Sequence, residues 1–517
     1  MDATAPLCFL AFRKKHMSSF PSPFAAPEPL SGLDPSDYVA GFSQPEASGG
    51  VPQSDDPRVT ALFRRKQTFA NKRFRAAKAS RNDLRAFVSD VRNQGVGVAG
   101  AGVMGVSIAA AFLNARVPVL ARDPAKAACD SARSRVTREL LELRWYSGEA
   151  LENAEEEETL VVDRVAEFFR VTQDLEALAA KPVVIESATE KPKLKAKFYH
   201  QLEDAATTSI LLLTNTSSLT IAELSEALPR DEEDKHTSVS RFAGFHFFNP
   251  VTRRRPVEIA VGAQTSPETI ARAVSLGREI NKLPMVVGDS PGFLVNRLLQ
   301  AFLNEALAEL DEGVPAERVE ALSRRFGMKV PPLRVIDEIG VDVAMLSGKS
   351  FYKAFPERTH VSTILPGLLR AERYGRKTRH GFYRYESRSG WQDDATFDAD
   401  RETLRRLADP TIGSIVENVD PRLHTDEALG LRSALVILFE AARLVEEGVV
   451  GSLRDVDAGL VLALGAPRDR GGICYWALSF GLDILLEAAK EFEPLGARFK
   501  APELLVKLSE ELCGRRR

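Results

Sequence analysis

The sequence predicts an α/β protein in which a doubly wound, largely parallel sheet is followed by two all-α modules. Short apolar segments alternate with helical segments from Gly95 onward, which is typical of parallel strands joined by helices. From residue 288 the apolar residues recur at helical spacing instead: Leu299, Phe302, Leu303, Ala306, Leu307 and Leu310. Several residues of this helical part reappear at a constant offset of 135, which indicates a duplicated module.

Length and composition indicate a globular chain of about two to four domains. It has 517 residues, of which 44% are hydrophobic and 27% charged, and its net charge of −3 gives no bias toward nucleic acid. No apolar run approaches the roughly 20 residues that span a bilayer. The four cysteines, Cys8, Cys129, Cys474 and Cys513, are far apart. We therefore expect neither a metal site nor disulfides, and a reducing compartment such as the cytoplasm.

Residues 1–57 are expected to be disordered, because residues 18–57 are rich in Pro, Ser and Gly. Residues 3–27 lack acidic residues and include several basic ones, which fits either a disordered tail, the interpretation we favour, or a transit peptide. A transit peptide would place the protein in an organelle matrix. Residues 58–93 are rich in Lys and Arg, with only Asp83 and Asp90 as acids. We interpret them as a basic linker helix; a surface for an acidic partner is the alternative.

Residues 94–287 are predicted to form a Rossmann-like dinucleotide-binding domain. A buried strand, Val96–Ala99, leads into the loop Gly100-Ala101-Gly102-Val103-Met104-Gly105, which opens an Ala-rich helix. Gly100, Gly102 and Gly105 allow a tight turn and a close approach of the backbone to a pyrophosphate. Asp123 ends the next strand, where a carboxylate would bind ribose hydroxyls and repel a 2′-phosphate. NAD is therefore the expected cofactor, with the adjacent Arg122 leaving NADP as an alternative.

Further strands are expected at Val117–Ala121, Val183–Ile185, Ile210–Leu213, Gly244–Phe248 and Met285–Val287. His246 lies on one of them, at the strand ends where such sheets bind ligands. Oxidising an alcohol requires a base for the hydroxyl proton, and a histidine suits that task near neutral pH. Glu258 is the candidate carboxylate for its other ring nitrogen. A histidine on an apolar strand is also often a satisfied core residue.

The helical region divides into a first module over 288–390, a linker over 391–424 and a second module over 425–517. The repeated residues, written as first and second copy, are Arg297 and Arg432, Glu305 and Glu440, Ala306 and Ala441, Glu312 and Glu447, and Gly313 and Gly448. The second copy has Leu431 where the first has Asn296. Only the first copy thus keeps a polar group at that helix start.

Five motifs together resemble the L-3-hydroxyacyl-CoA dehydrogenase family. They are Gly100–Gly105, Glu190–Lys195 (EKPKLK), Asn215–Leu219 (NTSSL), His246–Pro250 with Glu258, and Asp289–Arg297 (DSPGFLVNR). The match covers roughly residues 94–390, and the helical repeat extends it to about 510. The tandem modules, similar to the C-terminal domain of 6-phosphogluconate dehydrogenase, resemble the dehydrogenase half of the multifunctional fatty-acid oxidation enzymes. Only about 93 residues precede the glycine-loop domain, so we expect no hydratase domain here.

The resemblance implies roles for individual residues. His246 would be the general base and Glu258 its orienting carboxylate. Ser217 and Asn296 would contact the 3-oxygen and thioester region of the substrate, with Asn249 beside the histidine. Glu190 and Lys195 match positions that line the nicotinamide and ribose end of the cofactor site. From the residues alone, Ser217 fits a helix N-cap equally well.

Three departures from the family pattern stand out. Val330-Pro331-Pro332 replaces the usual Met-Gly-Pro, and Arg379 replaces the first glycine of Lys-Thr-Gly-x-Gly-Phe-Tyr. Arg253-Arg254-Arg255 is unusually basic and fits either the phosphates of CoA or an exposed loop. These changes bear on acyl-chain preference and on the domain interface more than on the chemistry.

The sequence is therefore interpreted as that of an NAD-dependent L-3-hydroxyacyl-CoA dehydrogenase of β-oxidation. The alternatives are reduction of acetoacetyl-CoA to 3-hydroxybutyryl-CoA, a related 3-hydroxyacid dehydrogenase with a non-CoA substrate, and an inactive cofactor-binding homologue. Retention of His246, Glu258, Ser217 and Asn296 argues against the inactive homologue. The expected partners are an acyl-CoA substrate and a thiolase or hydratase. The second helical module is expected to occupy the place that a second subunit fills in single-module dehydrogenases.

Overall fold

The chain folds into two compact units. The computed structural model describes residues 20–25, 29–30, 33–43, 56–149, 152–229, 237–386, 395–398, 403 and 420–514. The Rossmann unit comprises Arg65–Asn296 and Glu447–Asp455, and the helical unit comprises the described residues of Met1–Arg64, Arg297–Glu446 and Val456–Arg517. The boundary lies at 296/297 rather than at the expected 287/288, and both helical modules belong to one unit.

The Rossmann unit is built on a parallel sheet of six strands in the order β3-β2-β1-β4-β5-β6. The strands are β1 (Val96–Ala99), β2 (Val119–Arg122), β3 (Phe169–Thr172), β4 (Val183–Glu186), β5 (Leu211–Thr214) and β6 (Phe242–Gly244). This strand order is that of dinucleotide-binding domains, in which ligands bind outside the carboxyl ends of the strands. The predicted doubly wound parallel sheet is confirmed.

Helices cover both faces of this sheet. On one side α6 (Val103–Asn114), α7 (Lys126–Ser147) and α8 (Ala154–Phe168) pack together; the other group is α9 (Leu175–Ala179), α10 (Pro192–Ala205) and α11 (Ile221–Ser225). Right-handed crossovers from β1 toward β3 and from β4 toward β6 place the two groups on opposite faces. Because these strands are parallel, the carboxyl ends of β1, β2, β4 and β5 lie at the same edge of the sheet.

A second, three-stranded sheet accounts for one wrong prediction. The sequence predicted a single strand over Gly244–Phe248, but the chain leaves the large sheet after β6 and pairs as β7 (His246–Phe247) with β8 (Pro256–Val261). Strand β9 (Leu283–Gly288) then pairs parallel to β8, and α12 (Pro267–Glu279) joins these two strands. The register sets His246 directly opposite Glu258.

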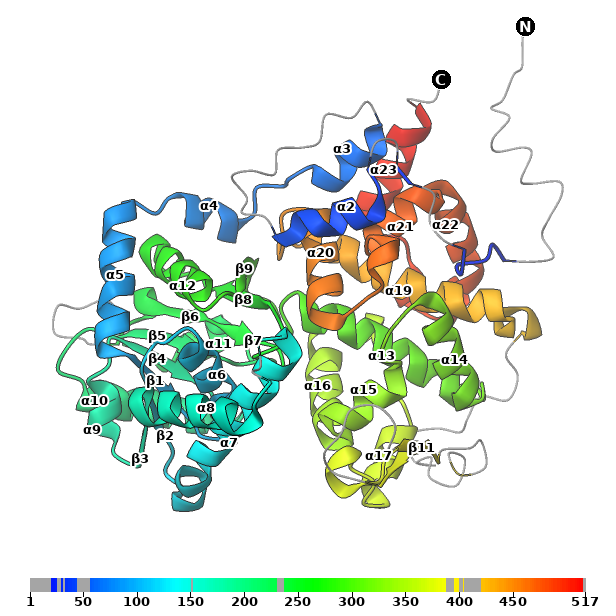
Figure 1. Cartoon of the computed structure of the whole chain (residues 1–517). Helices are drawn as coiled ribbons and strands as arrows, with labels where there is room; N and C mark the ends of the chain where they lie inside the picture. Colours follow the sequence, from blue (N-terminus) through cyan, green and yellow to red (C-terminus); the bar gives the residue numbers. More distant parts are fainter. Residues whose placement is uncertain are drawn as a thin grey trace, which may run out of the picture. The chain divides into compact units, whose positions relative to one another are not determined.

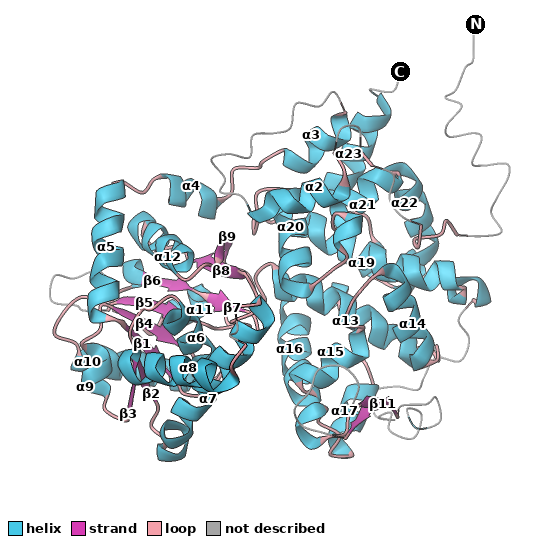
Figure 2. Cartoon of the chain, in the orientation of Figure 1, coloured by secondary structure: helices cyan, strands magenta, loops and turns pink. Residues whose placement is uncertain are grey.

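The helical unit is almost entirely helical over its described residues (Figure 2). The first module holds α13 (Val295–Asp311), α14 (Ala316–Phe326), α15 (Pro332–Ile339), α16 (Val341–Ala354), α17 (Ile364–Arg370), β10 (Tyr383–Tyr385) and β11 (Ala395–Phe397). The second holds α19 (Asp426–Glu446), α20 (Leu453–Gly459), α21 (Ile473–Phe480), α22 (Leu482–Ala489) and α23 (Glu503–Gly514). Most of the predicted linker 391–424 lies outside the described residues.

The two copies of the repeat bind each other reciprocally. Arg297 of the first copy donates from Nε to Glu440 of the second at 2.6 Å. Arg432 of the second copy donates from Nε and Nη2 to Glu305 of the first at 2.9 and 2.6 Å. All four side chains are nearly or fully buried. An exchange of equivalent contacts is the mark of a twofold relation, here between two parts of one chain.

The N-terminal region differs from the expected disorder where it is described. Asp34 caps helix α2 (Pro35–Ala40), and Tyr38 donates to Asp457 of the second module at 3.1 Å. The backbone N–H of Leu30 donates to the Tyr475 hydroxyl at 3.0 Å. These contacts tie the segment to the helical unit by polar bonds that composition does not reveal. Residues 1–19, on which the question of a transit peptide depends, lie outside the described residues.

The predicted linker helix over 58–93 is three helices: α3 (Pro57–Phe63), α4 (Phe69–Arg75) and α5 (Arg81–Gln94). Figure 1 shows α3 beside α21 and α23, in the helical unit. In the Rossmann unit, α5 begins at a capping box of Ser80 and Asp83 and packs against α12. Arg73 donates to the Ala263 carbonyl and Arg92 pairs with Glu279, so several basic residues of this segment have partners in the same unit.

Candidate active site

The glycine loop has the geometry that a bound pyrophosphate requires. Gly100 has φ +111°, and a Cβ there would lie 2.6 Å from the Ser187 carbonyl oxygen. A Cβ on Gly105 would lie 1.8 Å from the Gly100 carbonyl oxygen, so only glycine lets α6 approach the loop. Gly102, by contrast, has open space around it and starts α6 without a side-chain cap. The N-terminal amides of α6 are thus left to bind an anion.

Asp123 ties the glycine loop to the end of β2. Its two carboxylate oxygens accept hydrogen bonds from the backbone amides of Ala101 and Ala125, each at 2.9 Å. Each oxygen keeps a second lone pair that can accept a ribose hydroxyl. The residue is therefore oriented toward the loop before any ligand binds.

The residues at this edge fit a dinucleotide. Val103, the first residue of α6, is 64% exposed although it is apolar, and the Gly102 backbone beside it is open. The buried Ser187 hydroxyl, next to Gly100, has no hydrogen-bond partner among the described residues. A ligand bound here would remove the apolar side chain of Val103 from water and would give the Ser187 hydroxyl a hydrogen-bond partner.

His246 and Glu258 form a buried pair, as the sequence analysis proposed. His246 Nδ1 lies 2.6 Å from Glu258 Oε2, and the two residues are 4% and 0% exposed. The other oxygen of Glu258 accepts the backbone amides of Leu294 and Val295 at 3.0 and 2.9 Å. Because these amides hold the carboxylate, it can orient the imidazole and leave Nε2 for a substrate proton.

The loop after β5 gathers three of the predicted residues. Glu190 Oε1 accepts hydrogen bonds from the backbone amide and hydroxyl of Ser217 at 2.5 and 3.2 Å. Asn296 donates from Nδ2 to the Ser217 carbonyl at 3.2 Å. Asn215, in the same loop, accepts the Phe247 amide at 2.8 Å and so links this loop to the strand of His246. Ser217 therefore does not act as an N-cap; Thr220 caps α11.

The sequence did not predict a buried cluster of polar side chains at the end of β4. Glu186 is fully buried and accepts hydrogen bonds from Lys195, Tyr199 and Thr214. Lys195, which the resemblance placed at the cofactor, is only 1% exposed and faces this carboxylate. The sequence does contain a signal for this cluster, because an acidic residue, Glu186, ends the apolar run Val-Val-Ile-Glu. The predicted strand, Val183–Ile185, stopped one residue before it.

The remaining predicted residues lie outside these contacts. Asn249 is exposed, and its side chain bonds to none of the described residues. Arg253 pairs with Glu142 at 2.9 Å and stacks 3.5 Å over the Tyr146 ring, and Arg254 is half-buried. The basic tripeptide is therefore a partly packed loop rather than a fully exposed one.

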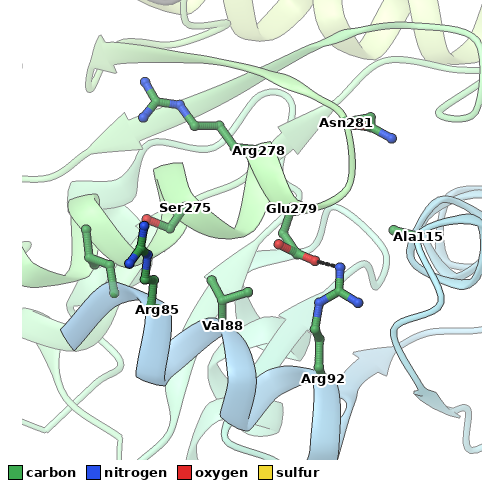
Figure 3. A pocket seen from close by; sticks show the side chains of 9 residues that line it. Arg85, Val88, Arg92, Ala115, Ser275, Arg278, Glu279 and Asn281 are labelled. Carbon is green, nitrogen blue, oxygen red and sulfur yellow. Dashed lines mark ion pairs between the residues drawn. The ribbon is translucent and has the colours of Figure 1, made fainter. Parts of the chain in front are cut away.

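The hollow between α5 and α12 lies away from this edge. Its lining is Leu84, Arg85, Val88, Arg92, Ala115, Ser275, Arg278, Glu279 and Asn281 (Figure 3). Ala115 follows the C-terminus of α6, whereas the glycine loop is at its N-terminus. A helix of this length spans about 18 Å, so the hollow is separate from the glycine loop. Figure 3 shows the Arg92–Glu279 ion pair reaching across it.

Two domain families match the chain in succession. The NAD-binding domain of 3-hydroxyacyl-CoA dehydrogenase matches residues 95–290, and the C-terminal domain of the same enzymes matches residues 292–385. The two matches together cover more than half of the chain. The chain belongs to the 3-hydroxyacyl-CoA dehydrogenase family. Its Rossmann unit is therefore an NAD-binding domain, which confirms the expected cofactor.

Known members of the family and its structural relatives resemble the chain over different lengths. The fatty acid oxidation complex subunit alpha of Psychrobacter sp. (strain PRwf-1) is 29% identical over 408 residues, which are 78% of this chain and 53% of that protein. The chain thus spans about half the length of the curated relatives it matches.

Two solved structures share the fold. The 3-hydroxybutyryl-CoA dehydrogenase of Escherichia coli K12 superposes with a TM-score of 0.63 at 24% identity, over 82% of this chain and 99% of that one. The dehydrogenase part of multifunctional enzyme 1 from C. elegans superposes with a TM-score of 0.51 at 23% identity, over 87% and 98%. The second match covers 87% of this chain, which is more than residues 1–424 make up, so its shared fold includes part of the second module.

The departures from the family pattern have local explanations. Pro332 begins α15 and Pro331 precedes it in extended conformation, a favourable placement for proline at a helix start. Arg379 has φ +60°, in the left-handed region that glycine adopts most easily.

Among the described residues, no helix is both long and apolar enough to cross a membrane.

Proposed function

We propose that the protein oxidises L-3-hydroxyacyl-CoA to 3-oxoacyl-CoA with NAD, as a step of fatty-acid β-oxidation. The observation that carries the proposal is the His246–Glu258 pair at 2.6 Å, with the second carboxylate oxygen held by two backbone amides. This pair leaves one ring nitrogen as a base at the edge of an NAD-binding sheet. Family membership supplies the substrate class.

The proposed mechanism divides the work between the histidine and the loop after β5. His246 Nε2 takes the proton of the substrate hydroxyl, and Glu258 stabilises the imidazolium that results. NAD would be held by the glycine loop and Asp123, and it would supply the acceptor for the hydride from C3 of the substrate. Ser217 and Asn296, which are joined by a hydrogen bond of 3.2 Å, hold the 3-oxygen and thioester end. The carbonyl that forms at C3 then has polar groups around it.

The test is NADH formation on 3-hydroxyacyl-CoAs from C4 to C16, which also measures the chain-length preference. His246→Gln should lower kcat by about 10² to 10⁴ while NADH binding stays nearly intact. His200→Gln is the matched control, because His200 is an exposed histidine on α10. Parent-like activity of His246→Gln, or a loss of NADH affinity as large as the loss of rate, would contradict the assignment.

We also propose a cytoplasmic location and a thiolase or hydratase partner. The described cysteines Cys129, Cys474 and Cys513 are free thiols, which supports a reducing compartment. The fatty acid oxidation complex subunit is about twice as long as the matched region and belongs, by its name, to a complex, which supports a partner enzyme for this chain. Co-purification of the full chain with such an enzyme is the test.

A further inference from the structure

Lys195 and Glu186 form a buried ion pair beside the candidate active site. Lys195 Nζ lies 2.7 Å from both carboxylate oxygens of Glu186, and their side chains are 1% and 0% exposed. The same ammonium lies 3.7 Å from Glu190 Oε2. One cation is thus enclosed by two carboxylates.

Glu186 is fixed by donors from three elements. Thr214 at the end of β5 donates to Oε2 at 2.7 Å, and Tyr199 of α10 donates to the same oxygen at 3.1 Å. The backbone amide of Ala188 donates to Oε1 at 2.6 Å. Burial and then the charge of Glu186 raise the pKa of Tyr199 well above its usual value, so its hydroxyl remains a donor. Lys195 is therefore held by an immobile partner.

Glu190 connects the Lys195–Glu186 ion pair to the loop that contains Ser217. Its carboxylate accepts the Thr216 hydroxyl at 3.1 and 3.0 Å in addition to the amide and hydroxyl of Ser217. Without the lysine, the carboxylates of Glu186 and Glu190 would face each other uncompensated. Repulsion would then move Glu190, and the Ser217 amide and hydroxyl that bond to it would lose their position.

We propose that Glu186 and Lys195 are positioning residues that place Ser217 for the reaction through Glu190. The proposal rests on the proposed function for its kinetic consequences. A buried ion pair is by itself weak evidence of a stabilising role, because apolar side chains of similar volume often stabilise as well.

The decisive variant is the double substitution Glu186→Gln with Lys195→Met in the full chain. It removes both charges at nearly constant volume and leaves no lone buried ion. In this variant Glu190 loses the ammonium that lies 3.7 Å from its carboxylate, so its position is no longer fixed. We expect normal folding by circular dichroism and a kcat about 10²-fold lower, because small misplacements of reacting groups cost that much. Lys181→Met is the matched control: Lys181 precedes β4 at the opposite end of the sheet and bonds to the Gln94 carbonyl.

Combination with Ser217→Ala separates positioning from general damage. If the pair acts through Ser217, adding Ser217→Ala to the double variant should lower kcat little further. Independent effects would instead multiply, and that result would overturn the proposal. Equal kcat of the double variant and the parent would overturn it as well.

Hydrogen exchange gives a readout that does not depend on turnover. The Ser217 amide donates to Glu190, so its exchange in the ligand-free chain should be at least about tenfold faster in the double variant. Exchange in β1 should not change. Unchanged protection at Ser217 would overturn the proposal. If the parent oxidises no 3-hydroxyacyl-CoA, the proposed function fails, and this exchange measurement still decides the positioning role.

Discussion

The two helical modules have the same arginine and glutamate at equivalent positions, but they differ in the residue just before that arginine. Asn296, in the first copy, donates to the Ser217 carbonyl at 3.2 Å. Its counterpart Leu431 is fully buried in the apolar interior of the second module. Arg297, Glu305 and their counterparts, by contrast, exchange equivalent bonds. The mutual contact thus constrains both copies, whereas only the first copy carries a polar group at the candidate active site.

Each module also contains a buried aspartate that accepts consecutive backbone amides. Asp337 accepts the amides of Phe382 and Tyr383 and the hydroxyl of Tyr385. Asp457 likewise accepts two consecutive backbone amides, those of Cys474 and Tyr475. In both modules a glycine precedes this turn, and a Cβ on it would lie 2.0 or 2.4 Å from the aspartate.

The third donor to this aspartate has a different origin in each module. The first module supplies Tyr385 from its own strand β10. The second receives Tyr38 from α2, 419 residues away along the chain. The second module is thus completed by a distant segment, whereas the first is completed locally.

Removal of the second module should have the largest effect. Truncation after residue 424 deletes Glu440 and Arg432, so Arg297 and Glu305 lose their buried partners. Uncompensated buried charges cost several kcal/mol, about 3–5 for each broken pair, and the apolar face of α13 becomes exposed. We expect association or aggregation in size-exclusion chromatography with light scattering. A soluble, fully active monomer of residues 1–424 would refute the pseudo-symmetric role of the second copy.

Breaking one of the reciprocal ion pairs should lower the free energy of unfolding by less than the truncation does, and the loss should depend on pH. Burial opposes ionisation of Glu305, but Arg498 and Arg432 outweigh it and lower its pKa to about 2. A carboxylate with a lowered folded-state pKa contributes stability above its ordinary pKa near 4.5 and loses it as the pH falls toward about 2. Glu305→Gln should therefore destabilise the chain by about 3 kcal/mol at pH 7 and by less near pH 3.

Urea unfolding at the two pH values measures this difference. Glu440→Gln, which breaks the reciprocal pair, should destabilise the chain to a similar degree at pH 7. The control is Glu511→Gln, since the Arg64–Glu511 pair is about half exposed and should contribute less than about 1 kcal/mol. If Glu305→Gln and Glu511→Gln lowered the free energy of unfolding equally, the buried ion pairs would not stabilise the contact between the two copies.

Removing one tyrosine hydroxyl should distinguish the local from the distant donor. Tyr385→Phe and Tyr38→Phe should each cost about 1 kcal/mol, but only Tyr38→Phe should increase proteolysis ahead of residue 56. Burial raises the pKa of Asp457 to about 7. The aspartate is therefore neutral at pH 5 and ionised at pH 8.5, where the Tyr38 bond is charge-assisted and stronger. A cost of Tyr38→Phe that is not larger at pH 8.5 than at pH 5 would contradict the assignment.

The smallest expected effect is a gain in stability. Arg379 has φ +60° in the turn of the first module, whereas the second module has Gly471 with φ +71° before its turn. Arg379→Gly relieves the strain of a bulky residue in the left-handed region but adds freedom to the unfolded chain, so the net gain should be at most about 1 kcal/mol. Thermal unfolding measures it, and a lower melting temperature would show that the arginine side chain contributes more than its backbone costs.

The parts of the protein that the sequence determined by itself are those encoded by local pattern. The glycine loop and the parallel sheet follow from periodicity or from motifs of fixed spacing, and the structure confirms them. The sequence named His246 and Glu258 only as a candidate pair, and their contact at 2.6 Å is known from the structure. The single strand over Gly244–Phe248 and the single linker helix over 58–93 were wrong. In both places the chain changes partners within a few residues, which local pattern does not reveal.

Only the tertiary structure decided which distant side chains complete each site. The role proposed for Glu186 depends on side chains from β5 and α10, because Thr214, Tyr199 and Lys195 donate to its carboxylate at the end of β4. Tyr38 likewise meets Asp457 across 419 residues of sequence. The physical reason is the same in both cases. A buried charge or hydroxyl must find partners somewhere in the fold, but hydrogen bonding sets the distance between atoms and not the separation along the chain.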